Sequence, residues 1–176
     1  MELTLREMWA VIHGMMLGSL FLLAYAGGLA ELFNLGSEYA TDAGIAKRVR
    51  RLIFGTWVMA IVAWLTVIVG TWIVYPWYRA KPPAGADLSL FPRSLLLSKP
   101  TTAEWHKFGM EWKEHVAWLA PILATAVAYM VTRYGVRLAQ DNEVRRAVIV
   151  LFSVAFFAAA TAGLFGAFIN KAAPIH

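Results

Sequence analysis

The chain has 176 residues, of which 60% are hydrophobic and 15% are charged, and its formal net charge at pH 7 is +5. Soluble domains average about 45–50% apolar and about 25% charged residues, so this composition excludes an ordinary soluble domain and indicates a membrane protein. The sequence has no cysteine, which excludes disulfides, thiolate nucleophiles, cysteine-ligated zinc, iron–sulfur clusters and covalently attached c-type haem. The positive charge does not indicate nucleic-acid binding, because most basic residues flank apolar runs, where they set topology and contact anionic lipids.

Four apolar stretches are long enough to cross about 30 Å of hydrocarbon, which takes about 20 helical residues. The segment "MELTLRE" that precedes the first stretch is too acidic for a cleaved signal peptide, so we interpret that stretch as a retained span. Since lipid offers no partners for backbone groups, each span must be a helix. We therefore expect a single all-α membrane domain in which four transmembrane helices form two hairpins. The predicted spans cover residues 8–33, 52–77, 115–136 and 148–169.

Lys and Arg are concentrated in the two short connections between these spans. The first connection holds Lys47, Arg48, Arg50 and Arg51, and the second holds Arg133, Arg137, Arg145 and Arg146. The other face carries as many basic residues, but they are spread over both termini and the long middle connection. By the positive-inside rule, the dense basic connections predict an inner-membrane protein with both termini on the outer side.

The long connection ends in the segment "TTAEWHKFGMEW". Thr101 and Glu104 have the spacing of a capping box, in which each side chain bonds to the backbone of the other residue. We therefore expect a short amphipathic helix over about 102–113, lying at the head-group layer before the third span. Three aromatic residues recur on one face of this helix: Trp105, Phe108 and Trp112.

His13 is the clearest candidate for a functional group, because ionisable residues inside a span are costly and rare. It lies about five residues inside the first span, or roughly 7–8 Å at 1.5 Å per residue. Gly14 and Gly18 beside it would let another helix or a flat ligand approach closely. Two interpretations remain open: a histidine hydrogen-bonded to a neighbouring helix, and a ligand in a redox site.

His115 begins the third span on the same predicted side as His13. Glu111 precedes it by one helical turn and is placed to accept a hydrogen bond from the imidazole, as the supporting residues of metal-ligating histidines do. An ordinary histidine–glutamate pair at the membrane interface is the alternative.

Together, His13 and His115 are the smallest set that could hold a b-type haem between helices without cysteine. Space for the porphyrin would come from small residues, namely Gly14, Gly18, Ala117 and Ala120. Cations for its propionates would come from Arg79, Lys81 and Lys113 near the same edge.

The other two histidines are expected to play smaller parts. His106 lies half a turn off the face of His115, which favours a position facing solvent or the edge of a quinone site. His176 is the last residue. Within the third span, Pro121 predicts a kink, and Thr125 is expected to bond to the carbonyl group that this proline frees, that of Ala117.

A compact four-span chain with inward histidines near one surface resembles the small membrane-anchored b-type cytochrome subunits of respiratory and photosynthetic complexes. The resemblance covers the architecture and the two positions His13 and His115. It implies a non-hydrolytic redox subunit that transfers electrons between quinol and a periplasmic partner, with haem b and quinone as cofactors. The alternative is a cofactor-free structural subunit whose apolar surface is covered by lipids and other membrane subunits of a complex.

Overall fold

A computed structural model describes residues 2–36 and 41–175, so His176 lies outside the described residues. The described residues form helices and turns and contain no strand. The structure contains helices long and apolar enough to cross a membrane, which confirms the all-α class and the presence of four candidate spans. These helices are Leu5–Asn34, Asp42–Arg79, Pro100–Tyr134 and Asn142–Ala172. Their pairing into hairpins, their orientation and the interfacial position of residues 102–113 stay predictions.

The first long helix consists of α1 (Leu5–Val11), a π-helical turn η1 (Ile12–Met16) and α2 (Leu17–Asn34). It begins at a capping box, where the Thr4 hydroxyl accepts from the backbone N–H of Glu7 at 3.2 Å and the Glu7 carboxylate accepts from the N–H of Thr4 at 2.8 Å. These bonds satisfy two of the free N–H groups at the helix start, so the helix begins before the predicted residue 8.

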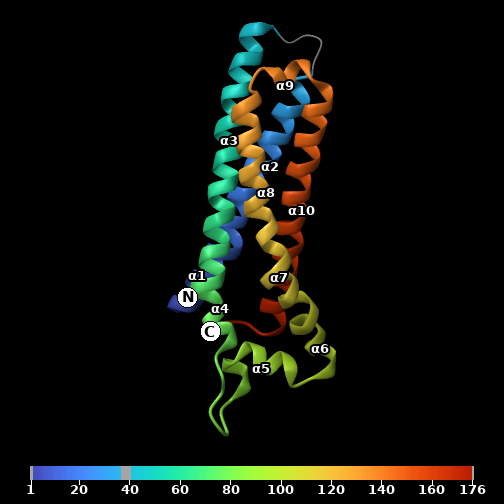
Figure 1. The fold of residues 1–176 in the computed structure, drawn as a ribbon. Coiled ribbons are helices and arrows are strands. Elements are labelled where there is room, and N and C mark those ends of the chain that lie inside the picture. Colours follow the sequence, from blue (N-terminus) through green and yellow to red (C-terminus); the bar gives the residue numbers. More distant parts are fainter. Residues whose placement is uncertain (1, 37–40, 176) are drawn as a thin grey trace. The chain divides into compact units, whose positions relative to one another are not determined.

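The remaining long helices are also longer than the predicted spans (Figure 1). The second comprises α3 (Asp42–Val69), η2 (Gly70–Val74) and α4 (Tyr75–Arg79), and the fourth is α10 (Asn142–Ala172). The third comprises α6 (Pro100–Glu104), η4 (Trp105–Met110), α7 (Glu111–His115), η5 (Val116–Trp118) and α8 (Leu119–Tyr134). Four basic residues predicted in a connection therefore lie within the first turns of α3, where a charged residue at the head-group level can continue a helix: Lys47, Arg48, Arg50 and Arg51.

The predicted capping box at Thr101 and Glu104 is wrong. The helix begins at Pro100, with Lys99 as the N-cap residue, because proline needs no N–H partner at the first helical position and its φ angle suits the helix. The Thr102 hydroxyl instead donates to the Leu96 carbonyl at 2.8 Å. The Glu104 carboxylate pairs with Lys107 at 3.2 Å.

The expected role of Thr125 is also wrong. Its hydroxyl donates to the carbonyl group of Pro121 itself at 2.7 Å, one turn earlier on α8. The turn before the proline, which contains Ala117, is the 3₁₀ segment η5. A tighter turn is one way for a helix to approach a residue that cannot donate a backbone hydrogen bond.

The described chain divides into two compact units, and each long helix contributes residues to both. Unit 1 comprises Met1–Gly18, Leu65–Trp118 and Ala159–His176, and unit 2 comprises Ser19–Trp64 and Leu119–Ala158. Unit 1 therefore contains the chain ends and the long middle connection. Unit 2 contains the two short connections.

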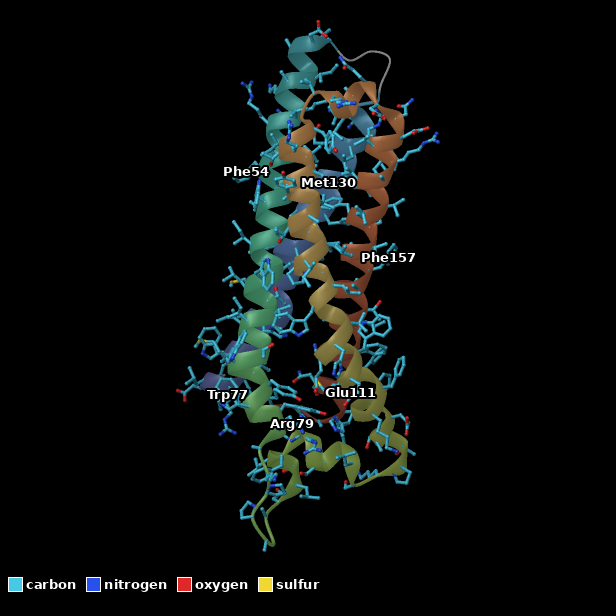
Figure 2. All side chains as sticks on the ribbon, in the orientation of Figure 1. Phe54, Trp77, Arg79, Glu111, Met130 and Phe157 are labelled. Carbon is cyan, nitrogen blue, oxygen red and sulfur yellow. The ribbon has the colours of Figure 1, made fainter. Side chains whose placement is uncertain are left out.

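In unit 2, parts of α2, α3, α8 and α10 pack against one another, as Figure 1 shows. Tyr25 on α2 lies 3.1 Å from the Ser153 hydroxyl on α10 and stacks on Phe156 at a centroid distance of 4.0 Å. Side chains such as Leu52, Met59 and Phe152 are fully buried in this unit. Phe54 and Phe157 extend away from the helices (Figure 2) and are 73% and 63% exposed, as expected for a lipid-facing surface.

In unit 1, the long connection folds into the short helices η3 (Leu88–Leu90) and α5 (Pro92–Leu97). Buried side chains from α4, α5, η4 and α10, with the residue that follows α10, form its core: Tyr78, Leu96, Met110, Ile169 and Ala173. The predicted aromatic face of residues 102–113 packs on α10. Trp105 stacks on Phe168 at 4.9 Å, while Phe108 and Trp112 contact Phe165 at 5.5 and 6.1 Å between ring centroids.

Candidate functional site

His13 lies within the π-helical turn η1 of unit 1. Its Nδ1 atom is buried and has no hydrogen-bond partner, while the ring lies within hydrogen-bonding reach of the Thr66 backbone. A buried polar atom without a partner costs about 1–3 kcal/mol, and native proteins keep few of them. His13 therefore retains one ring nitrogen that is available to a ligand.

The His13 ring lies against Gly70, the first residue of η2. A β-carbon at Gly70 would lie 2.7 Å from Cε1 of His13, so only glycine lets the ring approach this backbone. The predicted pair, Gly14 and Gly18, behaves differently. A β-carbon at either position would meet no atom within 4 Å, so these two residues leave open space and no helix packs closely on them within the described chain.

His115 and Glu111 form the predicted pair on one helical turn. Nδ1 of His115 lies 3.0 Å from the backbone carbonyl oxygen of Glu111 and 3.5 Å from its carboxylate. Both side chains are largely exposed, at 71% and 53%. Since Nδ1 faces these acceptors, Nε2 of His115 is the nitrogen left for a ligand.

Each of the two imidazoles therefore has one free nitrogen, which is what an axial haem ligand needs. The two rings have different neighbours, since His13 faces Gly70 and His115 faces Glu111. A shared iron between them stays a prediction. Of the cations proposed for the propionates, Arg79 is exposed and donates to the Tyr75 hydroxyl at 2.6 Å, and Lys81 is exposed on the connection that follows α4.

Lys113 occupies a different environment from the surface position expected of it. Its ammonium group donates to the backbone carbonyl of Ala162 on α10 at 3.3 Å, and a β-carbon at Gly166 would lie 2.8 Å from it. Lys113 also acts electrostatically on His13, so the two side chains lie in one neighbourhood. A lysine that faces the interior of a membrane helix bundle usually serves a ligand or a buried partner.

Two neighbours of Lys113 carry further buried polar atoms without a partner: Nε1 of Trp112 and Oε1 of Glu114. Indole N–H can only donate a hydrogen bond, and an ionised carboxylate oxygen can only accept one. Together with His13 Nδ1, these are the buried side-chain polar atoms without a partner among residues 2–36 and 41–175. All three belong to unit 1.

Tyr75 connects Glu114 to the exposed end of α4. Its hydroxyl accepts from Arg79 and lies within hydrogen-bonding reach of the Glu114 carboxylate. An arginine can only donate, so the hydroxyl proton of Tyr75 is free to point at Glu114. What the five residues share is that they belong to unit 1, and on this basis we call them the polar cluster: His13, Tyr75, Trp112, Lys113 and Glu114.

His106 is buried, with 9% of its surface exposed, so the interpretation of a solvent-facing side chain is wrong. The Arg93 guanidinium donates to Nε2 at 3.3 Å, and Nδ1 lies 2.8 Å from the Tyr78 hydroxyl. Because Arg93 can only donate, Nε2 must carry the lone pair and Nδ1 the proton, which it donates to Tyr78. These two hydrogen bonds fix the tautomer of His106 and link η4 to α4 and α5 within unit 1. The quinone-edge role stays a prediction.

The sequence pattern pointed to His13, His115 and Glu111 but missed Gly70, Trp112 and Glu114. A signal existed for Gly70, since it is an isolated glycine in the apolar segment "VIVGTWIV", where close approach of another group is a common reason. The three π-helical segments of the described chain also lie in unit 1, and they contain His13, Gly70 and His106. Such segments are frequent at functional sites and leave no simple pattern in a single sequence.

Comparisons of the chain with protein-family models, with curated proteins and with solved structures find no match.

Proposed function

We propose that this protein is an integral membrane subunit of an electron-transfer complex and that its polar cluster binds the head group of a quinol or quinone. A quinol hydroxyl both donates and accepts hydrogen bonds, whereas a quinone carbonyl only accepts. The proposal brings three atoms to one head group: the Trp112 N–H as donor, and the Glu114 carboxylate and His13 Nδ1 as acceptors. His13 Nδ1 accepts because the other ring nitrogen bonds to the Thr66 backbone. A quinol is a lipid-soluble molecule, and its head group can pair with all of these atoms.

The observation that carries the proposal is that three buried polar atoms without partners occur in one unit. At about 1–3 kcal/mol each, leaving them unpaired is a substantial cost for a membrane protein of ordinary stability. A ligand that pairs with them removes this cost. Polar groups inside a membrane protein are therefore functional candidates by default.

The chemistry of the cluster also suits a quinol. Oxidation of a quinol releases two protons and two electrons, so its site needs a proton acceptor and a redox partner. Glu114 has a free oxygen for a proton, and Tyr75 links its carboxylate to the exposed end of α4. Lys113 supplies a positive charge beside His13 that favours a ligand oxygen bearing partial negative charge.

Haem b is the redox partner that the proposal assigns to the same subunit, with His13 and His115 as its ligands. Because the single free nitrogen of His13 cannot ligate iron and bond to a quinol at the same time, a bound haem would leave the quinol to Trp112 and Glu114. A haem would supply one-electron chemistry, with Glu111 holding the orientation of His115. Electrons would then pass to a partner on the outer face. The subunit would catalyse no hydrolysis. Any catalytic activity would be a redox reaction of the whole complex.

A structural subunit without a cofactor is the second candidate. It is favoured by the large apolar side chains that unit 2 exposes, such as Phe54 and Phe157, which lipids or other membrane subunits would cover (Figure 2). It leaves the three unpaired atoms of unit 1 without a role. The quinone proposal accounts for them, and for this reason we prefer it.

Quinone that co-purifies with the protein tests the proposal. The expected result is a stoichiometric amount in extracts of the wild type and a clear loss in Trp112→Phe and Glu114→Gln. Glu104→Gln is the matched control, because Glu104 is a glutamate of the same long helix whose side chain is 71% exposed. Equal quinone in the wild type and both cluster variants would contradict the proposal and favour a structural subunit.

A further inference from the structure

Unit 2 contains a groove that the electron-transfer proposal does not use. The groove has a volume of about 200 Å³ and is lined by α2 and α3. Its lining residues are Leu23, Ala24, Gly27, Gly28, Glu31, Arg51 and Gly55. Sites for drug-sized ligands and cofactors have about 300–1,000 Å³, so this groove suits a single narrow chain better than a flat ring system.

Two glycines keep the groove open. A β-carbon at Gly27 or at Gly55 would meet no atom within 4 Å. Gly28 differs, because the Phe152 ring already fills the space beside it, with Cζ 2.8 Å from a β-carbon built there. The open length therefore runs past Gly27 and Gly55, with the exposed side chain of Leu23 at its apolar end.

The other end of the groove is positively charged. Glu31 pairs with Arg48 at 3.0 Å and lies farther from Arg51, at 3.6 Å, and the Arg51 side chain is 58% exposed. Arg51 therefore keeps most of its five N–H donors for another acceptor. Lys47 and Arg50 are also exposed on the same helix, so the basic charges outnumber the single carboxylate of Glu31.

The spacing of these features matches an amphiphile. Arg51 and Gly55 are four residues apart on α3, which places them on one face and about 6 Å apart along the helix. We infer that the groove holds one acyl chain of an anionic phospholipid whose phosphate lies against Arg51. The phosphate supplies the bidentate acceptor that a guanidinium fits, and the chain covers the two glycines. A transmembrane helix seated there would need its own anionic group at the same level.

Lipid binding measured by native mass spectrometry tests this inference. The detergent-purified protein is mixed with equal amounts of phosphatidylglycerol or phosphatidylcholine that carry the same acyl chains. We expect the wild type to retain more phosphatidylglycerol. Arg51→Gln should lower that retention about fivefold, because a basic residue near a membrane surface contributes about 1 kcal/mol to binding anionic lipid. Gly27→Leu combined with Gly55→Leu should abolish the preference by filling the groove.

Two controls separate the groove from general effects. Gly163→Leu adds the same side chain at a helical glycine of unit 1 that also has open space around it. Arg146→Gln removes an exposed arginine from α10. Both controls should bind lipid like the wild type. Equal retention of the two lipids, or an equal loss in the controls, would overturn the inference. A dimer that only the groove variants abolish, with lipid binding unchanged, would assign the groove to a second copy and would also overturn it.

Discussion

The His13 imidazole lies against the backbone of Gly70, where a β-carbon would come within 2.7 Å of Cε1. Gly70→Ala should therefore lower the free energy of unfolding by about 1–3 kcal/mol, the usual cost of overpacking. Thermal denaturation in detergent measures this effect as a lower Tm. Restoring the Tm by adding His13→Ala to Gly70→Ala would show that the clash is with the imidazole.

Gly163→Ala is the control for Gly70→Ala, because a β-carbon at Gly163 meets no atom within 4 Å. It should raise the stability of its helix by up to about 1 kcal/mol, since alanine is the better helix former. A Tm for Gly70→Ala equal to or above that of Gly163→Ala would show that His13 does not occupy this position.

Tyr78→Phe should destabilise unit 1, because it removes the acceptor of the buried His106 Nδ1–H. Leaving that donor unpaired costs about 1–3 kcal/mol. The comparison is Tyr129→Phe, which removes a hydroxyl from a side chain that is 63% exposed and should leave the Tm almost unchanged. Equal Tm values for the two variants would mean that the His106 hydrogen bond contributes nothing to stability.

The predicted topology places residue 84 of the long connection on the outer side and residue 140 of the second short connection in the cytoplasm. Because the chain has no cysteine, Ala84→Cys and Gln140→Cys give single labelling sites at exposed positions. A membrane-impermeant thiol reagent applied to intact cells should label the first variant and leave the second unlabelled. Labelling of both variants, or of Gln140→Cys alone, would refute this topology.

The haem prediction is tested by the visible absorption of the purified protein, reduced minus oxidised. If His13 and His115 share an iron, His13→Ala should remove the reduced-haem band, because one axial ligand is lost. Glu111→Gln should keep the band and shift the reduction potential, since Glu111 acts through His115. No band in the wild type would rule out haem b and leave the quinone proposal to its own test.

The fold class followed from the sequence because apolar length and missing charge decide whether a helix can cross a membrane. The helix boundaries were less predictable, because charged and polar residues continue a helix beyond the apolar run. Arg48 and Arg51 illustrate this, since both lie on α3 and pair with Glu31 on α2. The early start of the first helix was readable from the sequence, because Thr4 and Glu7 have the spacing of a capping box.

The candidate site was predictable only in part. Glu111 was correctly placed beside His115, because the two residues are four apart on one helix and local spacing fixes their contact. Contacts between distant segments could not be read in this way. Lys113 looked like a surface cation from its neighbours in the sequence, yet it bonds to Ala162 on α10. His106 meets Arg93 and Tyr78 only because α5 and α4 pack beside it.

Quinone binding by the polar cluster is the central claim, and ligand-dependent thermal stability measures it most directly. A ligand that binds only the folded state stabilises it by about 2.7 kcal/mol at a hundredfold excess over Kd. Titrating a short-chain ubiquinone into the protein in lipid nanodiscs should therefore raise the Tm of the wild type and of Glu104→Gln to a plateau. The same titration should leave Trp112→Phe and Glu114→Gln with little or no rise. A wild type whose Tm shows no saturable change, or cluster variants that respond like the wild type, would contradict the account.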